Sequence, residues 1–511
     1  MDRRSFLKSV AGCGVASLAG PAVTLLARHP SAPAWFGLHP FIEAHPEAVF
    51  IRRTSVASKD DSEGKRREAL VLAKQIFSLR DTPGIPLTNK FAFKPNLTSA
   101  KGSGLAHAIV TDPYVVEGFV EGLKLGTIPA GQIYLREGLS VSQQGTGYVE
   151  LAQRSGAHYG DAESRTPTVK ECPDGVVFRR TKYLGPFNYP DSYLINISKF
   201  KAHSMGLTLC VKNLQGTNMP PYIRFCGGIQ NVIAQDFQPD AQTHVDDLYE
   251  KHRRAGMPRW HTERGAWMEM WIQRTLDHYS LIKPSVGLNM IEGIYAQNGD
   301  GFDGGPGSDG APEIFLTNLL IFGKDAFRVD IVGHWLGGHE PGNFGLFHVA
   351  RERGLSTALN PLNIPVYLWE DKGPKLTPLE QLSRTPLKTP YLEKSGESRF
   401  HMCDEPFAYA PETSSSSMSR LEAPRFRVLG RNNPVQGESS LVVEYSLPAD
   451  GSLSLDLYDA FGERVAIMAD GWRSKGVHMA SSNLRLKSSG TYFCRLRNAG
   501  VDRVRPVSVV S

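Results

Sequence analysis

The chain has 511 residues, of which 41% are hydrophobic, and a formal net charge of +5. This amount of apolar material can fill a large buried core, so the composition excludes wholesale disorder. A charge of +5 spread over this length argues against a nucleic-acid-binding protein, because such proteins usually carry a dense basic stripe. At about 100–200 residues per domain, we expect about two or three domains.

The first 34 residues have the layout of a signal peptide. Arg3 and Arg4 precede a modestly apolar run over residues 10–27, and an Ala-Pro-Ala cleavage motif follows at 32–34. The paired arginines resemble the twin-arginine export signal. A short membrane anchor is the alternative, but glycines and a proline interrupt the run. We therefore predict a periplasmic or extracellular protein, exported by the twin-arginine route, with no stable membrane span in the mature chain.

Six cysteines are present, and one of them, Cys13, lies in the predicted signal peptide. No pair of the others has C-x-x-C spacing, which argues against a four-cysteine iron–sulfur or zinc site. An exported protein can form one or two disulfides, but the sequence does not pair the cysteines. We predict no metal ligands, and the sequence leaves the cofactor unknown.

Strand-like and helix-like segments alternate from residue 49 to about 370. Residues 91–93 predict a strand, Asp112 and Pro113 predict the start of a helix, and residues 133–135 predict the next strand. The helix has an apolar face, because hydrophobic residues recur at helical spacing: Val115, Val116, Phe119, Val120 and Leu123. Further predicted elements are strands at 194–197, 207–211 and 314–322, and helices at 267–276 and 326–336. The predicted fold class is α/β, a largely parallel sheet with flanking helices, over residues 35–376.

Residues 377–427 differ in character from the preceding segment. Proline recurs there and serine fills positions 414–417, as in a partly extended linker. Short strand-like segments follow over 428–511, and within them Leu453, Leu455 and Leu457 alternate with polar residues. Such alternation is typical of a half-buried strand. We therefore predict a small C-terminal antiparallel β-sandwich.

Polar side chains gather at three places where predicted strands end. The three segments are Lys-Pro-Asn at 94–96, Lys-Phe-Lys-Ala-His at 199–203, and Lys-Asn at 212–213. Ligands of open α/β sheets bind beyond the carboxyl ends of the strands. The three segments therefore predict an anion site, and the alternative is a solvated edge strand, where lysines are common.

In the segment 199–203, the basic residues occupy every second position. If the strand that begins at residue 194 continues, Lys199, Lys201 and His203 share one face, because side chains alternate along a strand. Neighbouring ammonium groups lower each other's pKa. A carboxylate or an anionic ligand among them would stabilise the arrangement.

Acidic residues form a second group of candidates. Asp330 and His334 are four residues apart on a predicted helix and therefore face the same way. The glycine-rich loop 298–310 holds three aspartates, but the calcium-binding pattern fails there, since Phe302 and Gly304 occupy ligand positions. The plain alternatives are a surface helix pair and a loop with capping aspartates. The sequence also lacks G-x-x-x-x-G-K-[ST], G-x-S-x-G and H-E-x-x-H signatures.

These segments together resemble the family known as domain of unknown function 362. The likeness rests on residues 93–96, 111–113, 194–203, 207–216 and 323–330, which follow the family's order over roughly residues 50–370. The family is widely described as uncharacterised, so the resemblance implies a site of Lys, His and Asn residues but no reaction. Some members carry ferredoxin-like cysteine clusters, which this chain lacks.

The C-terminal tail is similar to the immunoglobulin-like domain of flagellar hook-capping proteins and to sorting domains of type IX secretion cargo. The likeness rests on residues 441–448, 453–462 and 489–496. It implies an accessory or surface-attachment module with an envelope or surface partner. A twin-arginine signal is unusual on type IX cargo, which favours attachment over sorting.

We therefore expect an exported protein that binds an anionic small molecule or cofactor in an α/β crevice. Lysines would neutralise charge and asparagines would orient the ligand, and the predicted ligand-binding residues are Lys94, Asn96, Lys199, Lys212 and Asn213. If the site is catalytic, Lys201 or His203 acts as acid or base and Asp330 positions them. The alternatives are a non-catalytic periplasmic or surface binding protein with a β-sandwich attachment module, and a purely structural role.

Overall fold

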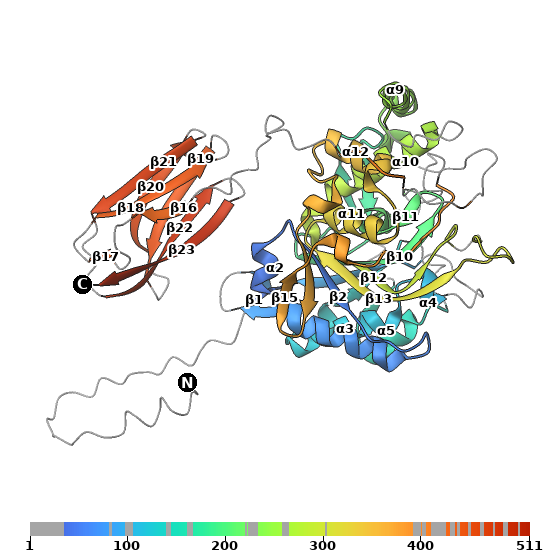
Figure 1. Cartoon of the computed structure of the whole chain (residues 1–511), viewed down its shortest axis with the longest axis horizontal. Helices are drawn as coiled ribbons and strands as arrows, with labels where there is room; N and C mark the ends of the chain where they lie inside the picture. Colours follow the sequence, from blue (N-terminus) through green and yellow to red (C-terminus); the bar gives the residue numbers. More distant parts are fainter. Residues whose placement is uncertain are drawn as a thin grey trace, which may run out of the picture. The chain divides into compact units, whose positions relative to one another are not determined.

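The computed structural model of the chain (Figure 1) contains two units, Met1–Ala408 and Tyr409–Ser511. The structure describes residues 35–80, 84–97, 106–138, 145–160, 167–219, 222, 234–257, 265–301, 304–391, 400, 405–409, 426–429, 435–436, 440–447, 451–459, 464–473, 476–483, 489–498 and 501–510. The predicted signal peptide over 1–34 lies outside these residues. Among the residues described, no helix has the length and apolar character needed to cross a membrane.

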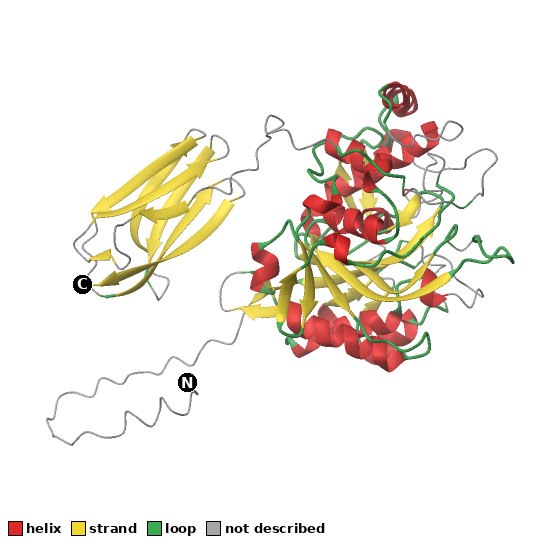
Figure 2. Cartoon of the chain, viewed as in Figure 1, coloured by secondary structure: helices red, strands yellow, loops and turns green. Residues whose placement is uncertain are grey.

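A ten-stranded sheet forms the centre of the first unit. Its order is β15 (Gly373–Leu376), β14 (Val366–Glu370), β2 (Val49–Arg53), β13 (Ile314–Gly323), β12 (Val286–Gln297), β10 (Ser192–His203), β5 (Lys90–Pro95), β6 (Ile133–Leu135) and β7 (His158–Tyr159), with β11 (Gly206–Thr208) paired to β10. Strands β12, β10, β5, β6 and β7 run parallel, and β13 is antiparallel to both neighbours. Helices cover both faces (Figure 2), which confirms the predicted α/β class.

The connection from β5 to β6 forms as its sequence predicts. Helix α5 (Pro113–Leu125) begins after Asp112, whose side chain accepts a hydrogen bond from the Tyr114 N–H. Its apolar face is buried against α3 (Ser62–Ile76) and the sheet. Gly118 permits this close packing, because a Cβ there would lie 2.3 Å from a backbone oxygen of α3.

Alternation along β10 divides the hydrophobic core into two layers. Ile197 packs in the layer that contains α3 and α5. Phe200 and Ala202 pack in the other layer, with α10 (Gly265–Ile282), α11 (Ala326–Leu336) and α12 (Gly345–Glu352). Since successive strand residues face opposite sides, Lys199 and Lys201 lie on the face opposite Phe200, as their spacing predicts.

Shorter elements complete the first unit. Three strands form a small sheet and two form another: β1 (Trp35–Leu38), β3 (Phe77–Arg80) and β4 (Ile85–Pro86); β8 (Thr168–Glu171) and β9 (Arg180–Tyr183). Three further helices add buried residues to the layer that contains α3 and α5: α2 (Pro40–Ala44), α4 (Ala106–Ile109) and α6 (Tyr148–Ser155).

A buried imidazole holds helix α9 (Ala241–Arg254) to the rest of the unit. His252 Nδ1 lies 2.9 Å from Glu269 Oε2 on α10, and its Nε2 lies 2.9 Å from Glu352 Oε2 on α12. Burial alone lowers the pKa of His252, but hydrogen bonds and charge from the two carboxylates outweigh burial and raise the pKa above its ordinary value. The imidazole therefore joins three helices.

Two boundaries differ from those predicted. The strand predicted over 207–211 ends at Thr208, because the chain turns into the short helix α7 (Cys210–Asn213). The sequence predicts a linker from residue 377, yet residues beyond that point are buried in the larger core: Leu379, Leu382, Leu387 and Tyr391. Isolated apolar residues in a proline-rich stretch have no periodicity that would predict their burial.

The second unit contains two sheets on one core. Their orders are β16 (Phe426–Leu429), β18 (Ser440–Leu447) and β21 (Gly476–Asn483), and β17 (Val435–Gln436), β23 (Val501–Val510), β22 (Gly490–Asn498), β19 (Gly451–Tyr458) and β20 (Arg464–Arg473). Apart from the β17–β23 pair, the paired strands are antiparallel. Val443 and Tyr445 of one sheet share a core with Leu455 and Leu457 of the other, as in a β-sandwich.

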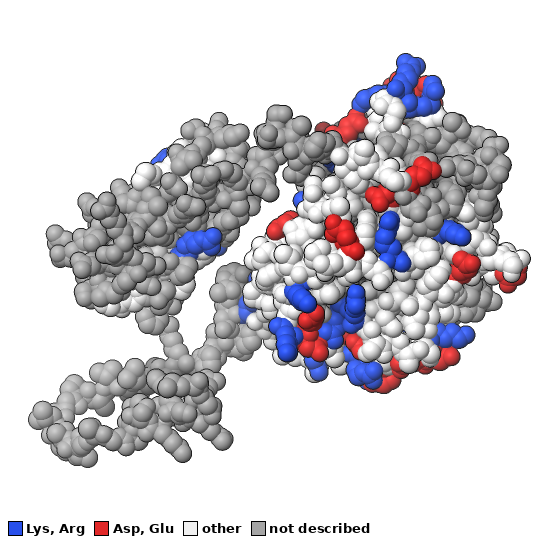
Figure 3. All heavy atoms as spheres, viewed as in Figure 1, with Lys and Arg blue, Asp and Glu red and all other residues white. Residues whose placement is uncertain are grey.

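Charged side chains on the first unit are mixed in sign. On the face drawn in Figure 3, Lys and Arg side chains lie among Asp and Glu side chains, and the described residues form no continuous basic stripe there. Some are paired locally, such as Arg66 with Glu63 and Arg253 with Glu250. This pattern agrees with the small net charge.

Candidate functional site

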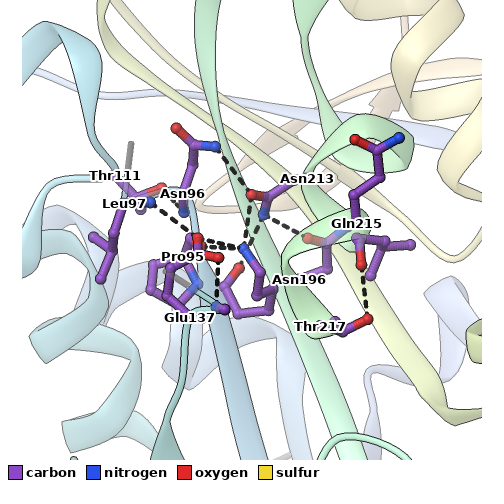
Figure 4. Close-up of polar contacts among 12 residues, drawn as sticks. Pro95, Asn96, Leu97, Thr111, Glu137, Asn196, Asn213, Gln215 and Thr217 are labelled. Carbon is purple, nitrogen blue, oxygen red and sulfur yellow. Dashed lines mark hydrogen bonds and ion pairs between the residues drawn. The ribbon is translucent and has the colours of Figure 1, made fainter. Parts of the chain in front are cut away.

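Segments from β5, the end of β6 and α7 bring Pro95, Glu137 and Asn213 together in one polar cluster (Figure 4). Lys94 is fully buried, and its Nζ donates to Glu137 Oε2 at 2.7 Å, to the Pro95 carbonyl oxygen at 2.6 Å and to Asn213 Oδ1 at 3.0 Å. Burial lowers the pKa of Lys94, and the charge and hydrogen bond of Glu137 oppose that shift. Lys94 is therefore one member of a buried ion pair.

The backbone closes tightly over this ion pair. Glu137 accepts further hydrogen bonds from the Leu97 N–H at 3.2 Å and the Gly138 N–H at 2.7 Å. A Cβ on Gly216 would lie 2.2 Å from Glu137 Oε1 and 2.6 Å from Lys94 Cε. Only glycine therefore fits at position 216 without displacing the pair.

Four asparagine side chains form a chain of hydrogen bonds beside Lys94. Asn96 donates to Asn213 Oδ1 at 3.2 Å, and Asn213 donates to Asn196 Oδ1 at 2.8 Å. Asn196 donates to Asn289 Oδ1 at 3.0 Å, and Asn289 donates to the Lys324 carbonyl oxygen at 3.0 Å. The chain brings the predicted residues Asn96 and Asn213 together and links β5, α7, β10 and β12.

Lys199 is neutralised by a second carboxylate. Its Nζ lies 2.5 Å from Glu292 Oε2 on β12, and both side chains are fully buried. Glu292 also accepts from the N–H groups of Asp112 at 3.1 Å and Ile294 at 2.9 Å. Asp112 pairs in turn with Lys65 of α3 at 2.7 Å. Lys199 thus belongs to a buried network that ties the start of α5 to the sheet.

Lys201 differs from both of these lysines. Its side chain is fully buried, and its Nζ has no hydrogen-bond partner in the part of the chain that the structure describes. The pKa of Lys201 lies well below its ordinary value, first because burial disfavours the ammonium and then because Lys212 and Lys199 add positive charge. Glu137 opposes this shift, and Lys94 adds to it. The surroundings therefore favour a neutral amine at Lys201.

His203 and Lys212 form the partly exposed side of the cluster. His203 Nδ1 accepts a hydrogen bond from the Met205 N–H at 3.4 Å. Burial and the charges of Lys212 and Lys201 hold the pKa of His203 well below its ordinary value, so the ring is neutral at pH 7. A Cβ on Gly301 would lie 3.4 Å from His203 Cδ2, which places the glycine-rich loop against the imidazole.

Asp330 is buried in α11 and faces α7. Its Oδ1 accepts from the Cys210 N–H at 2.7 Å, and its Oδ2 accepts from the Val211 N–H at 2.9 Å. The carboxylate therefore caps α7, a position that differs from the predicted one beside the acid–base residues of β10. Burial raises the pKa of Asp330 to about 7, against the effect of these N–H groups. His334 is also buried, with its ring centroid 4.6 Å from that of Phe344. Asp330 and His334 therefore do not form a pair on the protein surface.

The aspartates of the glycine-rich loop act within the loop and its neighbours. Asp300 accepts from the Ser204 N–H at 2.9 Å, and Asp309 accepts from the Ala311 N–H at 3.0 Å. Asp303 lies outside the described residues. In the ranges that the structure describes, no three His, Cys, Asp or Glu side chains gather in a metal-binding arrangement.

Two important carboxylates have weak sequence signals. Glu292 interrupts an apolar strand, and a charged residue in such a place needs a buried partner. Glu137 follows a three-residue strand and pairs with Lys94, which is 43 residues away. Only the fold could have identified that pair.

The lysine cluster lies in a segment of the chain that matches a known protein family. No curated protein matches the chain. The matched family has no assigned reaction, so the chemistry of the site has to come from its geometry. Every predicted site residue, from Lys94 to Asp330, lies within residues 92–334, which match the family described as "Domain of unknown function (DUF362)".

Proposed function

We propose that the lysine cluster at the carboxyl ends of β5 and β10 binds an anionic small molecule. A count of charges supports this. Lys94 and Lys199 are each paired with a carboxylate. Lys201 has no partner among the described residues, and Lys212 adds a further positive charge to its surroundings. The cluster therefore has more cations than carboxylates.

An anion would supply the missing partner. A phosphate or carboxylate group beside Lys201 and Lys212 would accept hydrogen bonds from both ammonium groups and reduce their mutual repulsion. The carboxyl ends of parallel strands are the usual ligand position in open α/β sheets. The observation that carries the proposal is the buried Lys201 amine with no described partner.

Proton uptake tests the proposal. Because the free site favours a neutral Lys201, an anion should draw about one proton onto it when it binds. Isothermal titration calorimetry with inorganic phosphate and with citrate, near neutral pH in two buffers of different ionisation enthalpy, measures that uptake. We expect binding with uptake in the wild type and in the control Lys74→Met, whose side chain is exposed, but no uptake in Lys201→Met. Failure of both anions to bind, or binding without proton uptake, would contradict the proposal.

We also propose that the protein is exported by the twin-arginine route and acts in the periplasm or outside the cell. The paired arginines support this. Replacing Arg3 and Arg4 together by lysine should trap the full-length chain in the cytoplasm, as cell fractionation and immunoblotting would show. Equal export of the variant and the wild type would contradict this route.

The second candidate function is a non-catalytic binding protein that attaches to an envelope or surface partner. It is favoured by the second unit's own hydrophobic core, which is formed by residues of its strands. Deleting residues 409–511 should then release the protein from its cell fraction without changing phosphate affinity. Unchanged localisation would contradict an attachment role.

A further inference from the structure

We propose that Lys201 is a nucleophile that forms an imine with the carbonyl group of an anionic oxo acid or oxo phosphate ester. This inference rests on the anion-binding role proposed above and adds a reaction to it. Its basis is the buried position of Lys201 at the end of β10, where Nζ has no partner among the described residues. Glu137 and Glu292 are both engaged by other lysines and by backbone N–H groups.

The lone pair of the amine decides which lysine can react. Lys94 donates to three acceptors and Lys199 is paired with Glu292, so the Nζ atoms of both are already engaged. Lys201 instead is buried beside cationic neighbours, and these two conditions are known to activate lysines toward carbonyl compounds. Lys212 is partly exposed and can pair with the carboxylate or phosphate of the same substrate. The carbonyl carbon, and not the anionic group, then lies beside Lys201, whose amine keeps its lone pair, whereas inorganic phosphate has no carbonyl and places its charge there.

The step is balanced without a further reactant. The Nζ lone pair attacks the carbonyl carbon and gives a carbinolamine. The carbonyl oxygen then leaves as water with the two amine hydrogens, and a C=N bond replaces the C=O bond. His203 lies two residues along β10 and has a neutral ring near Lys201. Because Nδ1 accepts from the Met205 N–H, Nε2 carries the hydrogen of the neutral ring. The imidazole can give that proton to the oxygen of the adduct and then take one from its nitrogen.

Reductive trapping tests the imine. The full-length protein is incubated with pyruvate, 2-oxoglutarate or dihydroxyacetone phosphate in the presence of sodium borohydride, and labelled peptides are mapped by mass spectrometry. Borohydride reduces the C=N bond to a stable secondary amine. We expect an adduct on Lys201 that forms at least about tenfold faster than on exposed lysines, since each unit of pKa depression raises the neutral fraction about tenfold. Excess inorganic phosphate should suppress it.

Variants separate this inference from the binding proposal. Lys201→Arg places a permanent cation at this position and cannot form the imine, so the adduct should disappear. The surface control Lys74→Arg should be labelled at Lys201 like the wild type. Peptide mapping of the adduct in the wild-type protein shows whether Lys201 reacts, even if a variant does not fold. Phosphate binding with no adduct on Lys201 from any of the three probes would overturn the imine and leave the binding proposal standing. Absence of both would overturn both.

Discussion

Replacing Lys201 by methionine should stabilise the first unit near neutral pH. Burial and neighbouring cations lower the pKa of Lys201 in the folded protein, whereas an unfolded chain has an ordinary lysine pKa of about 10.4. Folding near neutral pH therefore removes a proton from Lys201, which costs free energy. Methionine is similar in length and uncharged, so the variant avoids that cost.

The pH dependence gives the magnitude. Between its lowered folded pKa and its unfolded pKa, Lys201 binds one more proton in the unfolded chain than in the folded chain. The free energy of unfolding of the wild type therefore rises with pH, by about 1.4 kcal/mol per unit. From pH 7 to pH 9, the advantage of Lys201→Met should shrink by up to about 2.7 kcal/mol. Other titrating groups contribute equally to both proteins and cancel in the difference.

Urea unfolding followed by tryptophan fluorescence can measure this difference, because six of the seven tryptophans lie in the first unit. Curves at pH 7, 8 and 9 give the free energy of unfolding of each protein. The control Lys74→Met should stay within about 0.5 kcal/mol of the wild type at every pH. A difference between wild type and Lys201→Met that stays constant with pH would mean that folded Lys201 keeps its proton, and the reasoning would fail.

Three further predictions concern other buried groups. Glu137→Gln should lower the free energy of unfolding by about 3–5 kcal/mol, because it removes the carboxylate that is paired with the buried Lys94. The control Asp191→Asn removes a half-exposed partner of an ion pair and should cost at most about 1 kcal/mol. Equal losses of the two variants in urea unfolding would show that burial of the Lys94–Glu137 pair does not raise its contribution to stability. Gly216→Ala should cost about 1–3 kcal/mol and weaken phosphate binding, since its Cβ would overlap Glu137; an unchanged melting temperature and affinity would show that the backbone can withdraw. The stability that His252 contributes is fully present below its unfolded pKa of about 6.5 and is lost as pH rises through its raised folded pKa. Thermal melts from pH 6 upward should therefore show a falling component that is missing in His252→Gln, and parallel profiles would count against the imidazole bridge.

Sequence patterns predicted those helices whose ends are set by residues close by in the chain. Helix α11 has the bounds predicted for it, residues 326–336, and Asp112 caps α5 as its position before Pro113 suggests. The apolar run after residue 207 gave no sign of α7. The turn into that helix depends on Asp330, which lies 120 residues beyond Cys210 in the chain.

The position of the candidate site could be predicted from the sequence, but the pairing of its lysines with carboxylates could not. Parallel strands bring their carboxyl ends to one edge, so polar residues after β5 and along β10 had to converge. The sequence could not tell which lysines are neutralised. That depends on Glu137 and Glu292, which lie 43 and 93 residues from Lys94 and Lys199 and contact them only through the fold.

The four asparagine amides have a direction. Each gives its hydrogen to the oxygen of the next, from Asn96 to Asn289. The Lys94 Nζ, which donates to Asn213 Oδ1, and the Lys324 carbonyl oxygen, which accepts from Asn289, fix that direction. Turning one amide around would set oxygen against oxygen and hydrogen against hydrogen at its junctions, so no amide of the row can turn alone. An anion bound nearby, as proposed above, would therefore meet amide dipoles that are already aligned and that do not turn to suit it.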